Sequence, residues 1–176
     1  FSGIGNDTID AGTGDDTVNA DAGDDVVYAG DGNDTVHAGS GNDQVFGDAG
    51  NDLIFGYDGN DTISGGDGAD IMNGMTGDDL LDGGADNDSL LGGAGNDTLI
   101  AEDDATAYGR EGNDSLTGSD NATVFGGEGD DTVLADGTGE AHGGAGNDFV
   151  WARTGASGFA AEGNDVVYAT QESVAN

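Results

Sequence analysis

The sequence predicts an all-β solenoid in which short parallel strands stack as coils of eighteen residues. Three observations lead to this prediction: a nine-residue repeat that keeps its register from residue 2 to residue 100, a glycine-rich turn in each repeat, and one inward apolar position per repeat. The chain has 176 residues, with 37 Gly, no Pro and no Cys. We expect a single solenoid domain over residues 1–176.

The repeat starts with SGIGNDTID, AGTGDDTVN and ADAGDDVVY and continues through eleven units to residue 100. Position four is Gly in all but one unit, position six is always Asp, and position eight is apolar. Gly supplies the positive φ of a tight turn, and Asn or Asp at position five tolerates the same conformation. The apolar residue is the centre of a short strand that faces inward. Each unit is therefore predicted to form one turn and one strand of three residues.

Two units would form one coil, and stacked coils would align their strands in two parallel sheets over a narrow core of Val, Ile and Leu. With a rise of about 4.8 Å between coils, ten coils would make a rod roughly 48 Å long. Each coil buries only two aliphatic side chains, which we expect to be too few to offset the ordering of eighteen residues.

The charge of the chain also opposes folding. There are 37 Asp and Glu against 2 Lys and Arg, and the formal net charge is −35. Such a surface repels nucleic acid and anionic membranes, so we expect neither nucleic-acid binding nor membrane insertion by this segment. Because the absence of Cys excludes disulfides, a multivalent cation is the predicted partner.

The aspartates at position six are the predicted ligands. Stacking would bring them together along each edge of the solenoid, and carboxylates within about 5 Å of each other repel unless a hard cation lies between them. Calcium suits carboxylate and turn carbonyl oxygens better than magnesium, which demands a small rigid octahedron, or zinc, which prefers His and Cys. The predicted calcium ligands are Asp7, Asp16, Asp25, Asp34, Asp43, Asp52, Asp61, Asp70, Asp79, Asp88, Asp97, Asp114, Asp131, Asp148 and Asp165.

The unit GGAGNDTLI at 92–100 fits the pattern G-G-x-G-x-D-x-U-x, with U a large aliphatic residue, at every position. The chain resembles the RTX (repeats-in-toxin) nonapeptide family of calcium-binding repeats over almost its whole length. This resemblance implies a right-handed parallel β-roll of about ten two-strand coils with calcium in the turns. It also implies type I secretion and a location outside the cell or on the bacterial cell surface.

From residue 101 the units alternate between eight and nine residues, beginning with AEDDATAY and GREGNDSLT. Because odd and even units lie on opposite edges, the aspartate series would stop at Asp88 on one edge and continue to Asp165 on the other. We interpret the missing residue as the turn position that carried the ligand. Residues 2–100 would then bind calcium on both edges and residues 101–176 on one, with about thirteen ions in all.

The shortened units end in Tyr108, Phe125, His142, Phe159 and Asn176. These positions would stack at the spacing of one coil and form a mostly aromatic row on the outer face. The row could stabilise the sheet through contacts between neighbouring strands, or it could form a binding or assembly surface. The sequence leaves both interpretations open.

The leading functional interpretation is a calcium-binding structural module that folds after export, when it meets extracellular calcium. One alternative is a self-assembling segment of a surface layer, adhesin or filament, which would associate with its own copies end to end or side by side. A less favoured alternative is a polysaccharide-binding module. We expect flanking domains, because the first residues already lie inside a repeat. No catalysis is expected, since the carboxylate pairs recur in every unit and His37 and His142 have no Ser or Cys partner.

Overall fold

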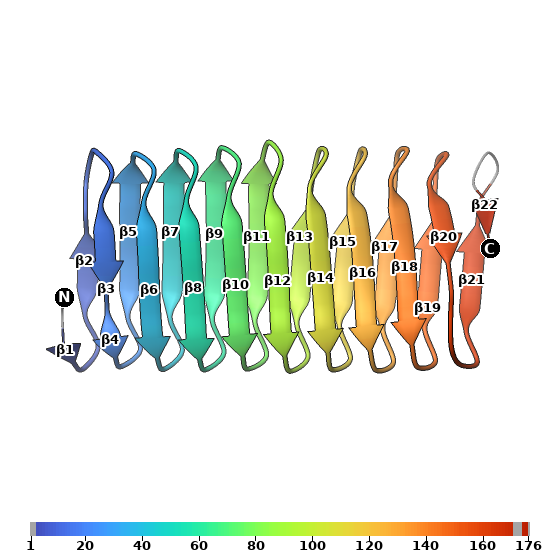
Figure 1. Cartoon of the computed structure of the whole chain (residues 1–176), viewed down its shortest axis with the longest axis horizontal. Coiled ribbons are helices and arrows are strands. Elements are labelled where there is room, and N and C mark those ends of the chain that lie inside the picture. The colour runs from blue at the N-terminus through green and yellow to red at the C-terminus, as the bar shows by residue number, and fades with distance from the viewer. Residues whose placement is uncertain (1–2, 171–173, 176) are drawn as a thin grey trace.

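The computed structural model describes residues 3–170, 174 and 175, and within these residues all regular secondary structure is β-strand. Figure 1 shows the chain winding as successive flat coils along one axis, with one strand of each coil in each of two sheets. The strand pairs between neighbouring coils are parallel in the described residues, as in Leu81 beside Leu99. The predicted parallel β-solenoid is confirmed, with about nine turns.

In the part of the chain that the structure describes, one sheet has twelve strands and the other has ten. The twelve-stranded sheet contains β1 (Gly3–Ile4), β3 (Thr17–Asn19), β4 (Asp21–Ala22), β6 (Thr35–Ser40), β8 (Leu53–Asp58), β10 (Ile71–Thr76), β12 (Ser89–Ala94), β14 (Thr106–Glu111), β16 (Thr123–Glu128), β18 (Glu140–Ala145), β20 (Ser157–Phe159) and β22 (Val174–Ala175). The ten-stranded sheet contains β2 (Thr8–Asp10), β5 (Val26–Asp31), β7 (Gln44–Ala49), β9 (Thr62–Asp67), β11 (Leu80–Ala85), β13 (Thr98–Ala101), β15 (Ser115–Gly118), β17 (Thr132–Ala135), β19 (Phe149–Ala152) and β21 (Val166–Ala169).

Most strands of the nonapeptide region are longer than predicted. β8 has six residues rather than three, because it continues from position seven of one unit to position three of the next. Tyr57, at position two, pairs with Gly39 and Met75 although its φ is 81°. The apolar pattern marks only the inward part of the strand, so the prediction of three-residue strands was wrong.

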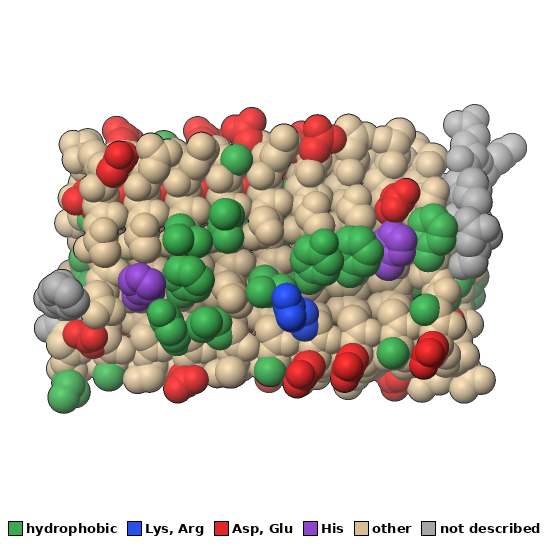
Figure 2. All heavy atoms as spheres, viewed as in Figure 1, with side chains coloured by type: hydrophobic (Ala, Val, Ile, Leu, Met, Phe, Trp, Pro, Cys, Tyr) green, Lys and Arg blue, Asp and Glu red, His purple; other side chains and the backbone are tan. Residues whose placement is uncertain are grey.

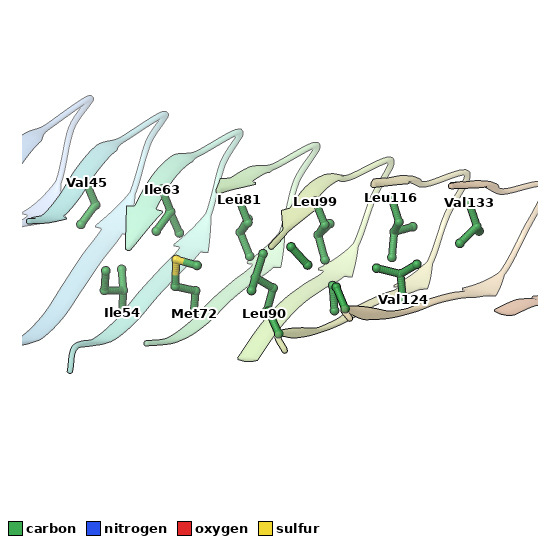
Figure 3. Close-up of a cluster of buried hydrophobic side chains, with 14 of the residues drawn as sticks. Val45, Ile54, Ile63, Met72, Leu81, Leu90, Leu99, Leu116, Val124 and Val133 are labelled. Atoms are coloured by element: carbon green, nitrogen blue, oxygen red, sulfur yellow. The ribbon is translucent and has the colours of Figure 1, made fainter. Parts of the chain in front are cut away.

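The core is a narrow layer of aliphatic side chains between the two sheets. In Figure 3, Val45, Ile63, Leu81, Leu99, Leu116 and Val133 from the ten-stranded sheet face Ile54, Met72, Leu90 and Val124 from the other sheet, and all ten are buried. In the shortened units, Ala107, Ala141 and Gly158 take the place of larger aliphatics on the twelve-stranded sheet. The described residues include no helix with the length and apolar character that a membrane crossing needs.

Candidate metal-binding rims

The turns between strands form two rims that run along the solenoid. The first rim contains the turns that lead from the twelve-stranded sheet to the ten-stranded sheet, such as the turn between β8 and β9, at the lower edge of Figure 1. The second rim contains the turns that lead back. Figure 2 shows acidic side chains gathered along both long edges of one face.

Close stacking of the coils explains the glycine at position four. Gly59 has a φ of 130°, and a side chain at this residue would collide with the carbonyl group of Gly41 in the preceding coil. Only glycine combines this backbone conformation with such a close approach. The turn main chains of successive coils therefore lie directly on one another.

Position five forms a side-chain ladder along each rim. The main-chain N–H of Asn42 donates to Asp24 Oδ1 at 2.9 Å, and the N–H of Asn60 donates to Asn42 Oδ1 at 2.8 Å. Each side-chain oxygen thus accepts a hydrogen bond from the coil that follows it in the sequence.

Position six forms a second ladder of opposite direction. The N–H of Asp43 donates to Asp61 Oδ1 at 2.8 Å, and the N–H of Asp61 donates to Asp79 Oδ1 at 2.8 Å. All fifteen predicted aspartates take part, from Asp7 to Asp165 on the first rim and from Asp16 to Asp88 on the second. The structure thus places the predicted residues in register, one coil apart.

The second carboxylate oxygen of the inner aspartates is buried and has no hydrogen-bond partner. A buried, unpaired carboxylate oxygen is costly unless it is protonated or contacts a cation. The aspartates at the ladder ends, Asp7, Asp16 and Asp165, are only half-buried. Among the described residues, the Oδ2 atoms without a partner belong to Asp25, Asp34, Asp43, Asp52, Asp61, Asp70, Asp79, Asp88, Asp97, Asp114, Asp131 and Asp148.

A main-chain carbonyl oxygen lies near several of these unpaired atoms. A methyl carbon built on Gly47 would lie 2.5 Å from Asp52 Oδ2, and it would also collide with the carbonyl oxygen of Gly65 in the next coil. The same arrangement recurs on the first rim, where a methyl carbon built on Gly126 would collide with both Asp131 Oδ2 and the carbonyl oxygen of Gly143. A carboxylate oxygen and a carbonyl oxygen from adjacent coils therefore face a common point.

This donor set fits calcium. Over the described residues, no three His, Cys, Asp or Glu side chains come together as one metal site, so a cation at a rim would take further ligands from the main chain. Ca²⁺ accepts six to eight oxygens and uses backbone carbonyls readily, whereas structural zinc sites need four His or Cys ligands.

Burial perturbs the carboxylates along both rims. Desolvation raises the pKa of Asp61 to about 7, although the hydrogen bond from the Asp43 N–H opposes the shift. Desolvation likewise raises the pKa of Asp97 and Asp131 to about 7, with neighbouring aspartates adding to the rise. The pKa of Asp88, on the second rim, is raised to about 6 for the same reason. Ionised carboxylates at these positions are therefore unfavourable without a compensating cation.

After Asp88 the second rim is closed in a different way. The N–H of Ala105 donates to the carbonyl oxygen of Glu102 at 3.0 Å, which closes a β-turn, and Asp103 adopts a φ of 52°. Ala122 and Ala156 close the corresponding turns with Ser119 and Arg153. These three turns are closed by main-chain hydrogen bonds and add no carboxylate to the aspartate ladder.

The interpretation of the missing residue was wrong. The N–H of Thr106 donates to the carbonyl oxygen of Asp88, and the N–H of Thr123 donates to that of Ala105, so Ala105 occupies position six. Position six is kept because it joins the turn to the strand ladder, and the deleted residue lies earlier in the turn. The carboxylate is lost by replacement, and the residues at this position are Ala105, Ala122, Gly139 and Ala156.

The aromatic row forms on the outer face of the twelve-stranded sheet, where Figure 2 shows a run of hydrophobic side chains with one His. Phe125 lies 4.8 Å from Tyr108 and 4.5 Å from His142, and His142 lies 4.6 Å from Phe159, all as stacked rings. The ring faces are therefore used against each other, which favours a stabilising role over stacking with a sugar. Asn176 lies outside the described residues.

The two histidines singled out by sequence lie away from the rims. His37 stacks on Phe55, and its Nδ1 lies 3.0 Å from the Tyr57 hydroxyl oxygen, whereas His142 Nε2 lies 3.2 Å from Glu140 Oε2. Arg153 forms an ion pair with Asp136 at 2.7 Å.

Comparison with known proteins agrees with this geometry. A family model described as the RTX calcium-binding nonapeptide repeat (4 copies) matches residues 1–36, 37–72, 64–99, 101–133 and 135–156. A search of curated proteins finds no match.

Proposed function

Because the chain belongs to the family of RTX calcium-binding nonapeptide repeats, we propose that it is a structural module whose folding is driven by calcium filling the two rims. The observation that carries this proposal is the row of buried Oδ2 atoms without partners along each rim. When calcium is bound, it supplies the positive charge that balances these buried carboxylates.

We assign the ligands as follows. The Oδ2 atoms of the fifteen position-six aspartates would bind the ions, while their Oδ1 atoms keep the hydrogen-bond ladder intact. Carbonyl oxygens at position one, such as that of Gly65 beside Asp52, would complete the ligand set. One ion between each neighbouring pair gives about thirteen ions, which would offset about 26 charges of the formal net charge of −35.

The charge balance also suggests where the protein works. At submicromolar calcium, as in a cytosol, repulsion among the carboxylates keeps the chain unfolded, and at millimolar calcium binding is coupled to folding. Such a chain is suited to export in the unfolded state, which supports type I secretion and a place outside the cell or on a bacterial surface. The family is structural, and we propose no enzymatic activity for this segment.

The test is a calcium titration followed by far-ultraviolet circular dichroism. We expect a β-rich spectrum only with calcium, and a β-rich spectrum that persists at neutral pH in excess chelator would overturn the proposal. Asp61→Asn should raise the calcium concentration at the folding midpoint. The matched control is Asp104→Asn, which removes the same charge from an exposed residue outside the ladders and should leave the midpoint nearly unchanged.

A second candidate function is self-association through calcium. It is favoured by the ladder geometry, because each coil presents the same main-chain N–H and carboxylate groups to the next coil along the axis. The test compares the size of the protein with and without calcium. Sedimentation of the 176-residue chain in calcium and in chelator should reveal calcium-dependent oligomers, and a monomer at high concentration in saturating calcium would contradict this candidate.

A further inference from the structure

The residue at position one of the unit lies next to the carboxylate that follows it. Gly56, on β8, is buried, and a methyl carbon built on it would collide with Asp61 Oδ2. The same holds for nine glycines at this position, from Gly47 to Gly143, each of which precedes a rim aspartate by five residues. In every one of these turns the built methyl carbon would lie closer than 3.0 Å to the aspartate Oδ2. We call these nine turns the glycine turns.

Backbone conformation does not explain these glycines. None of the nine has a φ in the left-handed region, in contrast to the glycines at position four. A β-strand residue with ordinary φ accepts alanine without strain. Glycine is therefore required for the space that it leaves beside its Cα atom, because the carboxylate oxygen lies in that space.

Three inner aspartates are preceded by alanine instead. Asp25, Asp34 and Asp43 follow Ala20, Ala29 and Ala38, and these alanines are completely buried. Because a real methyl group cannot overlap a carboxylate oxygen, these three carboxylates cannot sit as Asp61 does beside Gly56. We call these the alanine turns.

The shortened units on the second rim show the same relation between the residue at position one and the carboxylate at position six. Where position six has no carboxylate, position one is Ala101, Ala135 or Ala152, and all three are buried. The exception is Gly118, where a methyl carbon would meet Val124 Cγ1 at 3.1 Å and Ala122 Cβ at 3.3 Å. No carboxylate needs the space there.

We infer that position one divides the calcium sites of this chain into two classes. The glycine turns leave the carboxylate and the adjacent carbonyl oxygen free to converge, so they bind calcium tightly and fill first. The alanine turns displace the carboxylate from that point, so they bind more weakly and fill last. This inference relies on the proposed function and adds an order of folding: residues 47–148 fold at lower calcium than residues 20–46.

Reciprocal variants test the inference. Gly56→Ala should weaken calcium binding at one site by roughly tenfold, in the range seen when groups that position a metal ligand are changed. Ala38→Gly should strengthen one weak site by a similar factor. Ordinary backbone effects have the opposite sign, because alanine in place of glycine stabilises a compatible strand and glycine in place of alanine destabilises it. The control is Gly118→Ala, which adds the same methyl group where no carboxylate lies.

The measurements are calcium isotherms by calorimetry and hydrogen exchange at intermediate calcium. Residues 20–46 should gain protection at higher calcium than residues 126–148, which lie about as close to the other end and have glycine turns. Equal midpoints for these two segments would overturn the inference. If Gly56→Ala does not fold, Ala38→Gly alone decides the question. A calcium midpoint that stays the same or rises in Ala38→Gly would contradict the division into two classes of site.

These outcomes are separable from those of the proposed function. If Asp61→Asn raises the calcium midpoint while Gly56→Ala leaves it unchanged, calcium still binds at the rims and only the division into classes is wrong. If neither variant changes calcium binding, the ligand assignment itself fails.

Discussion

Beyond residue 100 the two rims of the same coils are built differently. On the first rim, Asp114, Asp131 and Asp148 continue the buried carboxylate ladder. On the second rim, β-turns closed by Ala105, Ala122 and Ala156 take its place. Both sheets keep the same parallel strand pairing through these coils. The turns of this solenoid are therefore closed in two ways, by main-chain hydrogen bonds within the turn on the second rim and by the carboxylate ladder on the first.

The largest expected effect is that of calcium removal at neutral pH. Every coil passes through both rims, so repulsion on the first rim should unfold the metal-free turns as well. Hydrogen exchange in chelator should show loss of protection at Ala122 and Thr123 together with Asp131. Protection that persists at the second rim would mean that the two rims fold independently.

Lowering the pH should replace calcium in part. The pKa of Asp61 and Asp97 is raised from 3.8 to about 7 by burial, so the folded state binds more protons than the unfolded chain. The metal-free fold is then most stable below pH 3.8 and loses stability as the pH rises toward about 7. Circular dichroism of dialysed, calcium-free protein should show β-structure returning between pH 7 and 4. A spectrum that stays unfolded at pH 4 would contradict these shifts.

A single substitution on the first rim sharpens the comparison. Asp131→Asn keeps the shape of the side chain but removes the charge that would face a bound cation, and we expect a loss of about 3 kcal/mol in the free energy of unfolding in saturating calcium. In chelator at pH 4, where the fold should return, the same change should be nearly neutral, because burial raises the pKa of Asp131 to about 7 and the carboxyl group is already protonated. Denaturant unfolding under both conditions measures the two effects, and equal losses in both would argue against a metal ligand.

The aromatic row should matter less. Phe125→Ala removes two stacked ring contacts, and we expect a loss of about 2 kcal/mol with no change in the number of calcium ions bound. Denaturant unfolding and calorimetry check these two values. A normal stability combined with loss of self-association would instead assign the row to an assembly surface.

The smallest effect is expected at the ion pair beside the shortened rim. Arg153 and Asp136 are partly exposed, and such pairs contribute less than about 1 kcal/mol. Arg153→Ala should therefore change the unfolding midpoint only slightly, and increasing salt should abolish the difference. A large loss would show that this pair, rather than the β-turn, closes the rim.

Much of the fold could be predicted from the sequence because the solenoid repeats one local arrangement. The Asp at position six of the nine-residue units and the apolar residue at position eight determine which side chains stack, as Asp61 and Ile63 show. The six-residue strands were missed, since Tyr57 at position two pairs within the sheet despite its positive φ. That geometry depends on contacts between coils, which no single repeat displays.

The replacement at position six was also missed, although the sequence contains a signal for it. Read from its C-terminal end, the unit AEDDATAY places Ala105, Thr106 and Ala107 where GGAGNDTLI has Asp97, Thr98 and Leu99. Reading from the first residue of each unit instead placed the deletion at the ligand. The space beside each position-one glycine could not be predicted, because it depends on how a carboxylate packs against the strand that precedes it.

The opposed ladders at positions five and six have a mechanical consequence. Asn60 bonds toward the coil before it and Asp61 bonds toward the coil after it, so each turn is fastened to both neighbours. The sheet hydrogen bonds join the same neighbours along the same axis. A tensile load along the rod would therefore be shared by many hydrogen bonds at every interface between coils. A force that pulls one end of the chain away from the rod would instead break the hydrogen bonds of one coil at a time. The molecule should resist stretching far better than unravelling.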